Sequence, residues 1–114
     1  LLEGLGAVHA LCDAHGRPMH VIHRDVSPQN LMLGVDGAAR LTDFGIAKAR
    51  DRLAVTDAGQ FKGKVAYTAP EVLTGATSDV RTDLWSTGVV AWEAITGRRL
   101  FRGSMEAITR SVLR

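Results

Sequence analysis

Two aspartates and an asparagine stand at a spacing that suits phosphoryl transfer. Asp25 and Asn30 lie in the stretch HRDVSPQN, and Asp43 opens the stretch DFG. Phosphoryl transfer needs a carboxylate that orients the attacking hydroxyl and accepts its proton, together with oxygen ligands that hold magnesium against the phosphates. Magnesium binds carboxylate and amide oxygens and keeps several waters, so two side chains beside nucleotide phosphates make a sufficient site. The three residues therefore predict magnesium-dependent phosphoryl-transfer chemistry.

A helix followed by short strands is predicted to carry these residues. Apolar residues recur at helical spacing from Leu1 until Gly16 and Pro18 interrupt them, so we expect an amphipathic helix over residues 1–14. Three short apolar stretches follow, MHVIH, NLMLG and ARLTDF, and an Asp-Gly pair between the last two is a hairpin signal. We therefore expect short strands around a tight turn.

The second half of the chain is predicted to be a loop followed by helices. Residues 48–68 are polar and lack a period, which indicates a long loop of the kind that is often functional. Thr82 is a suitable N-cap and Gly97 a suitable C-cap for a well-buried helix, and residues 104–113 begin another helical pattern. The predicted buried face of the first of these helices comprises Leu84, Trp85, Val89, Trp92 and Ile95.

The composition is that of an ordinary globular chain, with 46% hydrophobic and 23% charged residues. The net charge is +2, and the fourteen Lys and Arg are spread along the sequence, so nucleic acid is not predicted as a partner. A single cysteine, Cys12, fits a reducing compartment, and we expect a cytoplasmic location. No apolar stretch is long enough to span a bilayer, so we expect no membrane contact by this segment.

Four motifs, in order and spacing, resemble those of the protein kinase family, and specifically of the eukaryotic-like serine/threonine kinases of bacteria. HRDVSPQN resembles the catalytic loop, DFG the magnesium-binding motif, GKVAYTAPE the end of the activation segment, and DLWSTGVVAWE the central buried helix. The resemblance implies an α+β fold, the mainly helical large lobe of the kinase fold with short β-hairpin strands. It also implies ATP and Mg²⁺ as cofactors and a protein serine or threonine hydroxyl as the substrate.

The resemblance assigns roles to individual residues of the catalytic motifs. Asp25 would be the catalytic base, while Asn30 and Asp43 would bind magnesium. Met32 would form the floor beneath the adenine of ATP. His23 and Phe44 would belong to a stacked hydrophobic spine, anchored by Asp83 from the buried helix, and His23 is thereby expected to be structural.

A regulatory pair is implied by the same resemblance. Arg24 would receive a phosphate on the activation segment, because a guanidinium fork pairs well with a dianion. Thr56 is the leading candidate for that phosphate, and Tyr67 and Thr68 are weaker candidates because they lie closer to the substrate-docking end.

Two positions depart from the family pattern. Serine/threonine kinases usually carry lysine two residues after the catalytic aspartate, and threonine after the glycine that precedes the xxYxAPE pattern. Ser27 and Lys64 occupy those positions here, so the lysine and the hydroxyl have traded places. Because the family brings the two segments together, we expect Lys64 to supply at Asp25 the ammonium that Ser27 cannot. The alternative is that Ser27 and Lys64 are solvated loop residues.

Nothing in the sequence resembles the glycine-rich loop, the strand lysine that holds the phosphates, or the glutamate that pairs with that lysine. An arginine partner for Glu71 would also lie beyond Arg114. Residues 1–114 are therefore expected to be a partial kinase domain, cut short at both ends and without the small lobe. We expect the complete protein to be a kinase and the isolated fragment to be inactive.

Three other interpretations remain open at the level of the sequence. The two aspartates could be turn and capping residues. The chain could be a pseudokinase or a kinase remnant that acts as a non-catalytic interaction module, although it retains the three residues that such proteins commonly lose. His9, Cys12 and His15 could bind zinc, but their spacing is poor and no second cysteine completes a closed site.

Overall fold

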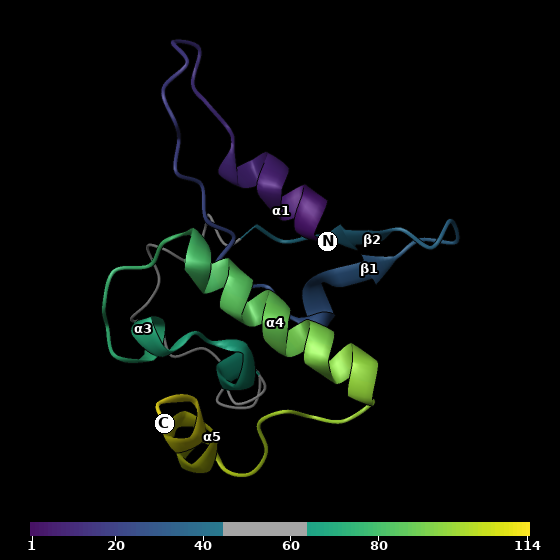
Figure 1. The fold of residues 1–114 in the computed structure, drawn as a ribbon, viewed down its shortest axis with the longest axis vertical. Coiled ribbons are helices and arrows are strands. Elements are labelled where there is room, and N and C mark those ends of the chain that lie inside the picture. Colours follow the sequence, from purple (N-terminus) through teal and green to yellow (C-terminus); the bar gives the residue numbers. More distant parts are fainter. Residues whose placement is uncertain (45–63) are drawn as a thin grey trace.

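The computed structural model describes residues 1–44 and 64–114. In chain order the elements are helix α1 (Leu2–His9), the 3-10 turn η1 (Pro28–Asn30), strands β1 (Leu31–Leu33) and β2 (Ala39–Leu41), the 3-10 turn η3 (Val65–Tyr67), and helices α3 (Pro70–Leu73), α4 (Val80–Thr96) and α5 (Met105–Val112). Helix α4 crosses the middle of the molecule, with α1 and the hairpin on one side and α3, η3 and α5 on the other (Figure 1). Among the described helices, none has the length and apolar character needed to cross a membrane.

The ends of α4 are fixed by its capping residues. The carboxylate of Asp79, the N-cap, accepts a hydrogen bond from the backbone N–H of Arg81 at 2.8 Å. Gly97 ends the helix in the left-handed conformation (φ 65°, ψ 18°), which glycine adopts without a steric penalty. The predicted C-cap is thus confirmed, whereas Thr82 as N-cap is wrong, because the helix begins at Val80.

The buried face of α4 is more polar than the sequence pattern predicts. Leu84 and Ile95 are 48% and 85% exposed, and both tryptophans are more than a third exposed. The buried side chains are Thr82, Asp83, Ser86, Thr87, Val89 and Val90. The predicted face is therefore wrong except at Val89. The polar face is buried because its side chains satisfy backbone groups of neighbouring segments, as Ser86 does at the carbonyl of Tyr67.

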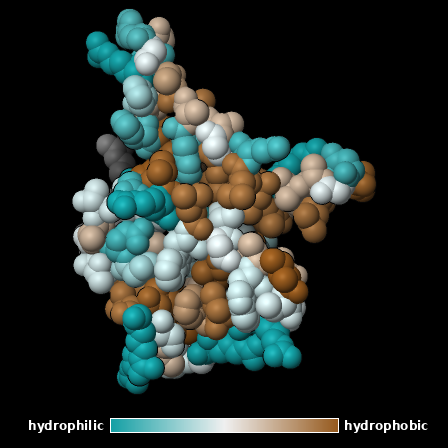
Figure 2. Space-filling model, in the orientation of Figure 1, coloured by the Kyte–Doolittle hydropathy of each residue, from teal (hydrophilic) through white to brown (hydrophobic). Residues whose placement is uncertain are grey.

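The hydrophobic core lies where η3 is enclosed by α4 and α5. Its buried members are Val65, Ala66, Tyr67, Val89, Val90, Ile108 and Val112. Figure 2 shows hydrophobic residues over the middle of this face, mainly hydrophilic ones at its top and bottom, and both kinds on the part that protrudes to the right. Residues 65–67 were expected to belong to a loop, and this expectation is wrong because they form the turn η3 and supply buried side chains to the core. Thr68, the last residue of the predicted loop, lies outside the helices and strands, and residues 48–63 lie outside the described residues.

The predicted hairpin is confirmed, and its turn follows from local chemistry. Strands β1 and β2 pair antiparallel with Leu31 opposite Leu41, and Gly37 adopts a positive φ of 74° in the turn. The carboxylate of Asp36 accepts the backbone N–H of Ala38 at 3.0 Å, which supports the same turn.

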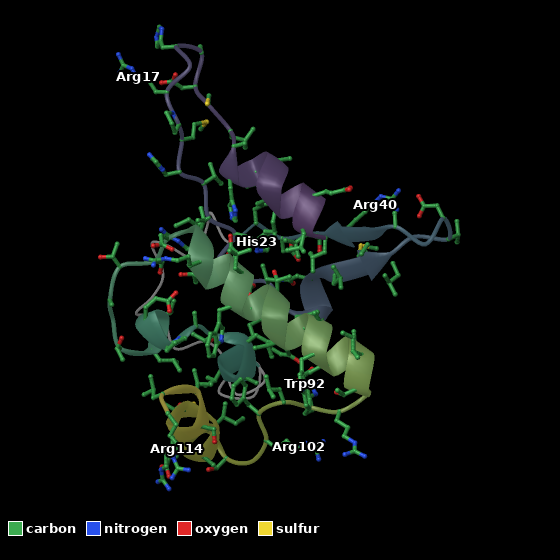
Figure 3. The ribbon with its side chains drawn as sticks, in the orientation of Figure 1. Arg17, His23, Arg40, Trp92, Arg102 and Arg114 are labelled. Carbon is green, nitrogen blue, oxygen red and sulfur yellow. The ribbon has the colours of Figure 1, made fainter. Side chains whose placement is uncertain are left out.

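The predicted first helix and first strand are both corrected. Helix α1 ends at His9, because the Asp13 carboxylate accepts the backbone N–H groups of His15 and Arg17 and so favours a turn over further helix. Arg17 lies at the protruding end of this segment (Figure 3). The stretch MHVIH, residues 19–23, forms no strand, and the N–H of His23 is donated to a side chain of α4 instead of a strand partner.

Candidate active site

The loop that carries Asp25 is anchored on a buried carboxylate of α4. Asp83 is fully buried, and its carboxylate accepts the backbone N–H groups of His23 and Arg24, each at 2.8 Å. It also accepts a hydrogen bond from Nε2 of His9 at 2.8 Å. Charge-assisted bonds of this kind are among the stronger hydrogen bonds in proteins. The turn before Asp25 is thereby fixed to the centre of the fold.

The ring of His23 is hydrogen-bonded at both nitrogens. Its Nε2 lies 3.1 Å from the carbonyl oxygen of Thr42, and its Nδ1 accepts the backbone N–H of Asp25 at 3.2 Å. The fully buried ring joins the catalytic loop to the residues before DFG, and in Figure 3 it lies beside the start of α4.

Asn30 lies against Asp25 and is held by two segments. Its Nδ2 donates to the backbone carbonyl of Asp25 at 2.7 Å, so the amide oxygen faces away from that carbonyl. The backbone carbonyl of Asn30 accepts the N–H of Thr42 at 2.8 Å and the Thr42 hydroxyl at 3.2 Å. Asp43 directly follows Thr42 in the sequence. The hairpin therefore brings Asp43 to the same end of the sheet as Asn30 and Asp25.

Two residues of the site have left-handed backbone conformations. Arg24 has φ 65° and Asp43 has φ 56°. Such a conformation costs a residue other than glycine about 1–2 kcal/mol, and strain of this kind clusters at functional sites. Phe44 follows Asp43, and its ring centroid lies 4.7 Å from that of His23, so the two predicted spine residues are in contact.

Lys64 contacts Asp25 although the two residues are 39 positions apart in the sequence. Its Nζ lies 2.5 Å from Oδ2 of Asp25, and the two side chains are 30% and 12% exposed. Ser27 is buried, and its Oγ has no hydrogen-bond partner within residues 1–44 and 64–114. The structure thus brings Lys64 to the predicted base and shows no such contact for Ser27.

A second polar cluster fixes the end of η3. Tyr67 donates its hydroxyl proton to Oε2 of Glu93 at 2.7 Å, and Arg99 donates to the same hydroxyl. Oε1 of Glu93 accepts the backbone N–H of Leu100 at 3.1 Å. Burial raises the pKa of Tyr67 to about 12, and the hydrogen bond to Glu93 acts in the same direction.

The remaining predicted site residues are less tightly held. Met32 is 62% exposed on β1 beside the site, and Arg24 is exposed with its backbone fixed by Asp83. Thr56, the predicted phosphate carrier, lies outside the described residues. The zinc alternative gains no support, since no group of three metal-binding side chains occurs in the described part of the chain and His9 is bound to Asp83.

Two residues that matter to the site were not assigned to it from the sequence. His9 was considered only as a zinc ligand, and the residue it contacts is 74 positions away, so no local pattern could reveal the pair. Thr42 ties Asn30 to His23 through backbone groups, which any residue type can supply. Its position immediately before DFG was the one available signal.

The donor groups fit a magnesium ion. An amide oxygen at Asn30 and a carboxylate at Asp43 are hard oxygen ligands, and magnesium takes one or two such protein groups together with phosphates and water. Asn30 is oriented by its bond to Asp25, and Asp43 is exposed toward solvent. These two residues are therefore the ones that would hold the ion.

Comparison with known proteins agrees with this arrangement. Residues 1–113 match the family described as protein kinase domain, and the chain belongs to that family. It is 45% identical over 99 residues to "Tyrosine-protein kinase MasK" of Myxococcus xanthus, covering 87% of this chain and 15% of that protein. It is 40% identical over 103 residues to "Serine/threonine-protein kinase PknA" of Mycobacterium tuberculosis, covering 90% of this chain and 23% of that protein. The chain thus spans less than a quarter of the length of these relatives.

Proposed function

We propose that residues 1–114 are the catalytic part of the large lobe of a serine/threonine protein kinase that uses ATP and Mg²⁺. The observation that carries the proposal is the hydrogen-bonded frame that holds Asp25, Asn30 and the residue before Asp43 together. Membership of the protein kinase family supports it. The relatives include several bacterial proteins named as serine/threonine kinases, which favours that specificity over tyrosine.

The proposed reaction is the transfer of the γ-phosphoryl group of ATP to a protein hydroxyl. The hydroxyl oxygen of a serine or threonine attacks the γ-phosphorus of ATP, and a new P–O bond forms. The bond from that phosphorus to the β,γ-bridging oxygen breaks, ADP leaves, and the hydroxyl proton passes to the Asp25 carboxylate. Asn30 and Asp43 would hold the magnesium, which supplies positive charge to neutralise the phosphates. Met32 would form the floor beneath the adenine.

Replacing the base tests the proposal. In the native protein, at whatever length its gene encodes, Asp25→Asn is expected to lower kcat by about 10²–10⁴-fold, the usual contribution of a general base. The measurement is transfer of γ-labelled phosphate to a protein substrate, followed by identification of the labelled amino acid. Asp36→Asn is the matched control, because Asp36 is an exposed aspartate at the hairpin turn and pairs with Arg40.

Each outcome of this experiment has a defined meaning. Label on serine or threonine that depends on Asp25 supports the proposal. Label on tyrosine would overturn the specificity while keeping the phosphotransfer. An Asp25→Asn protein as active as its parent would exclude the assigned mechanism, and a native protein without transfer would favour the non-catalytic interaction module.

A further inference from the structure

The cation at Asp25 comes from a different element than the base itself. Asp25 belongs to the loop before η1, whereas Lys64 is the N-cap residue of η3, 39 positions later. Both side chains are largely shielded from water, so their attraction is less screened than that of a surface pair. Phosphoryl transfer spreads negative charge over the transferred group, and a fixed ammonium beside the base is suited to stabilise it.

The loop that carries Asp25 offers no such charge at Ser27. Ser27 is buried, with 1% of its surface exposed, and its Oγ has no hydrogen-bond partner among the described residues. Among the described residues, the Ser27 hydroxyl therefore contributes neither a charge nor a hydrogen bond beside Asp25. The charge at this corner of the site therefore depends on Lys64.

The backbone of Lys64 is fixed by the packing of η3. Its carbonyl accepts the hydroxyl of Thr68 at 3.0 Å, and residues 65–67 are buried against α4 and α5. The carbonyl of Tyr67 accepts the hydroxyl of Ser86 from α4 at 2.7 Å. The position of the ammonium thus follows from the docking of η3 on α4.

We infer that Lys64 is the phosphate-stabilising cation of the reaction, delivered to Asp25 by the segment that follows DFG and not by the catalytic loop. This inference rests on the proposed function. It makes activity conditional on η3 being docked on α4, because a displaced η3 removes the ammonium while the hydrogen bonds of Asn30 to Asp25 and Thr42 remain. The Lys64 ammonium is then present beside Asp25 only while η3 is docked on α4.

Three substitutions in the native protein test the inference. Lys64→Met keeps the apolar stem and removes the charge, and it is expected to lower kcat about 10²-fold with the KM for ATP changed less than about threefold. Lys64→Arg is expected to recover part of kcat because it restores a cation. Lys62→Met removes the same type of charge two positions earlier and is expected to leave kcat near that of the parent. Thermal unfolding of each variant controls for loss of structure.

The outcomes separate this inference from the proposed function. If Asp25→Asn abolishes transfer while Lys64→Met keeps kcat within about threefold, the kinase assignment stands and the role of Lys64 is wrong. A Lys64→Met protein that loses only ATP affinity would also contradict it, because the charge would then serve binding alone. A loss of kcat that Lys64→Arg partly restores and Lys62→Met does not reproduce supports the inference.

Discussion

At the residue scale, the surroundings of Tyr67 favour the protonated, neutral form of its hydroxyl. Its hydroxyl donates to Glu93, and burial raises its pKa to about 12 from the ordinary value of 10. The folded protein therefore binds this proton more tightly than the unfolded chain. The stabilisation is fully present below pH 10 and is lost as the pH rises from about 10 to about 12.

Comparison with Tyr67→Phe isolates this effect. The free energy of unfolding of the parent protein is expected to fall more steeply than that of Tyr67→Phe between about pH 10 and 12, because phenylalanine has no proton to lose. The measurement is urea unfolding of both proteins at pH 9, 10, 11 and 12. Parallel pH curves for the two proteins would mean that the hydroxyl does not titrate as described.

The residues proposed to perform chemistry were the easiest to predict from the sequence, because few side chains can act as a base or bind magnesium. A base and magnesium ligands restrict the choice to carboxylates and amides, and Asp25, Asn30 and Asp43 stand in a recognisable order. The structure brings them to one place, although their roles remain proposals. His9 could not be assigned in this way, because its contact with Asp83 depends on how α1 packs on α4.

At the element scale, helix α4 supports both the loop that carries Asp25 and the turn η3. Asp83 binds the backbone of the loop, and Ser86, one turn later, binds the carbonyl of Tyr67. Both side chains are buried on the same face of the helix. The loop carrying the base and the segment carrying Lys64 therefore share one support.

The docking of η3 can be tested through Ser86. Ser86→Ala is expected to lower the free energy of unfolding by about 1–3 kcal/mol, because it leaves the Tyr67 carbonyl without this partner in a buried position. Ser111→Ala is the matched control, since among the described residues that exposed hydroxyl bonds to a carbonyl of its own helix, and a change within about 0.5 kcal/mol is expected. Urea unfolding measures the free energy of unfolding of both variants. Equal losses would show that the hydrogen bond to η3 adds no more stability than a bond within one helix.

Elements defined by local chemistry were predicted well, and those defined by tertiary contacts were not. The hairpin follows from Asp36 and Gly37, and the end of α4 from Gly97, because each requirement lies within a few residues. The early end of α1 depends on Asp13, whose side chain competes with the helix. The buried face of α4 was missed because hydrophobic periodicity does not register polar groups that are satisfied by distant backbone.

At the scale of the whole molecule, the described part of the chain holds the proposed base and the proposed magnesium ligands but has little around the proposed position of the nucleotide. Met32 and Leu33, beside the predicted adenine position, are 62% and 77% exposed. The 114 residues contain no glycine-rich loop and no motif for the lysine that holds the phosphates in the kinases they resemble. Family membership was therefore readable from the motifs, whereas the surroundings of ATP were not.

The isolated 114-residue chain is accordingly expected to transfer phosphate negligibly, while the native protein transfers it readily. Holding ATP in a reactive geometry contributes several kcal/mol to catalysis, and the chain supplies one side of that site at most. The measurement compares γ-labelled phosphate transfer by the isolated chain with that by its own Asp25→Asn variant, so that contaminating kinases are subtracted. Circular dichroism of both proteins establishes that they are folded. Transfer by the isolated chain above the level of its variant would show that Asp25, Lys64 and the magnesium ligands suffice without a second lobe.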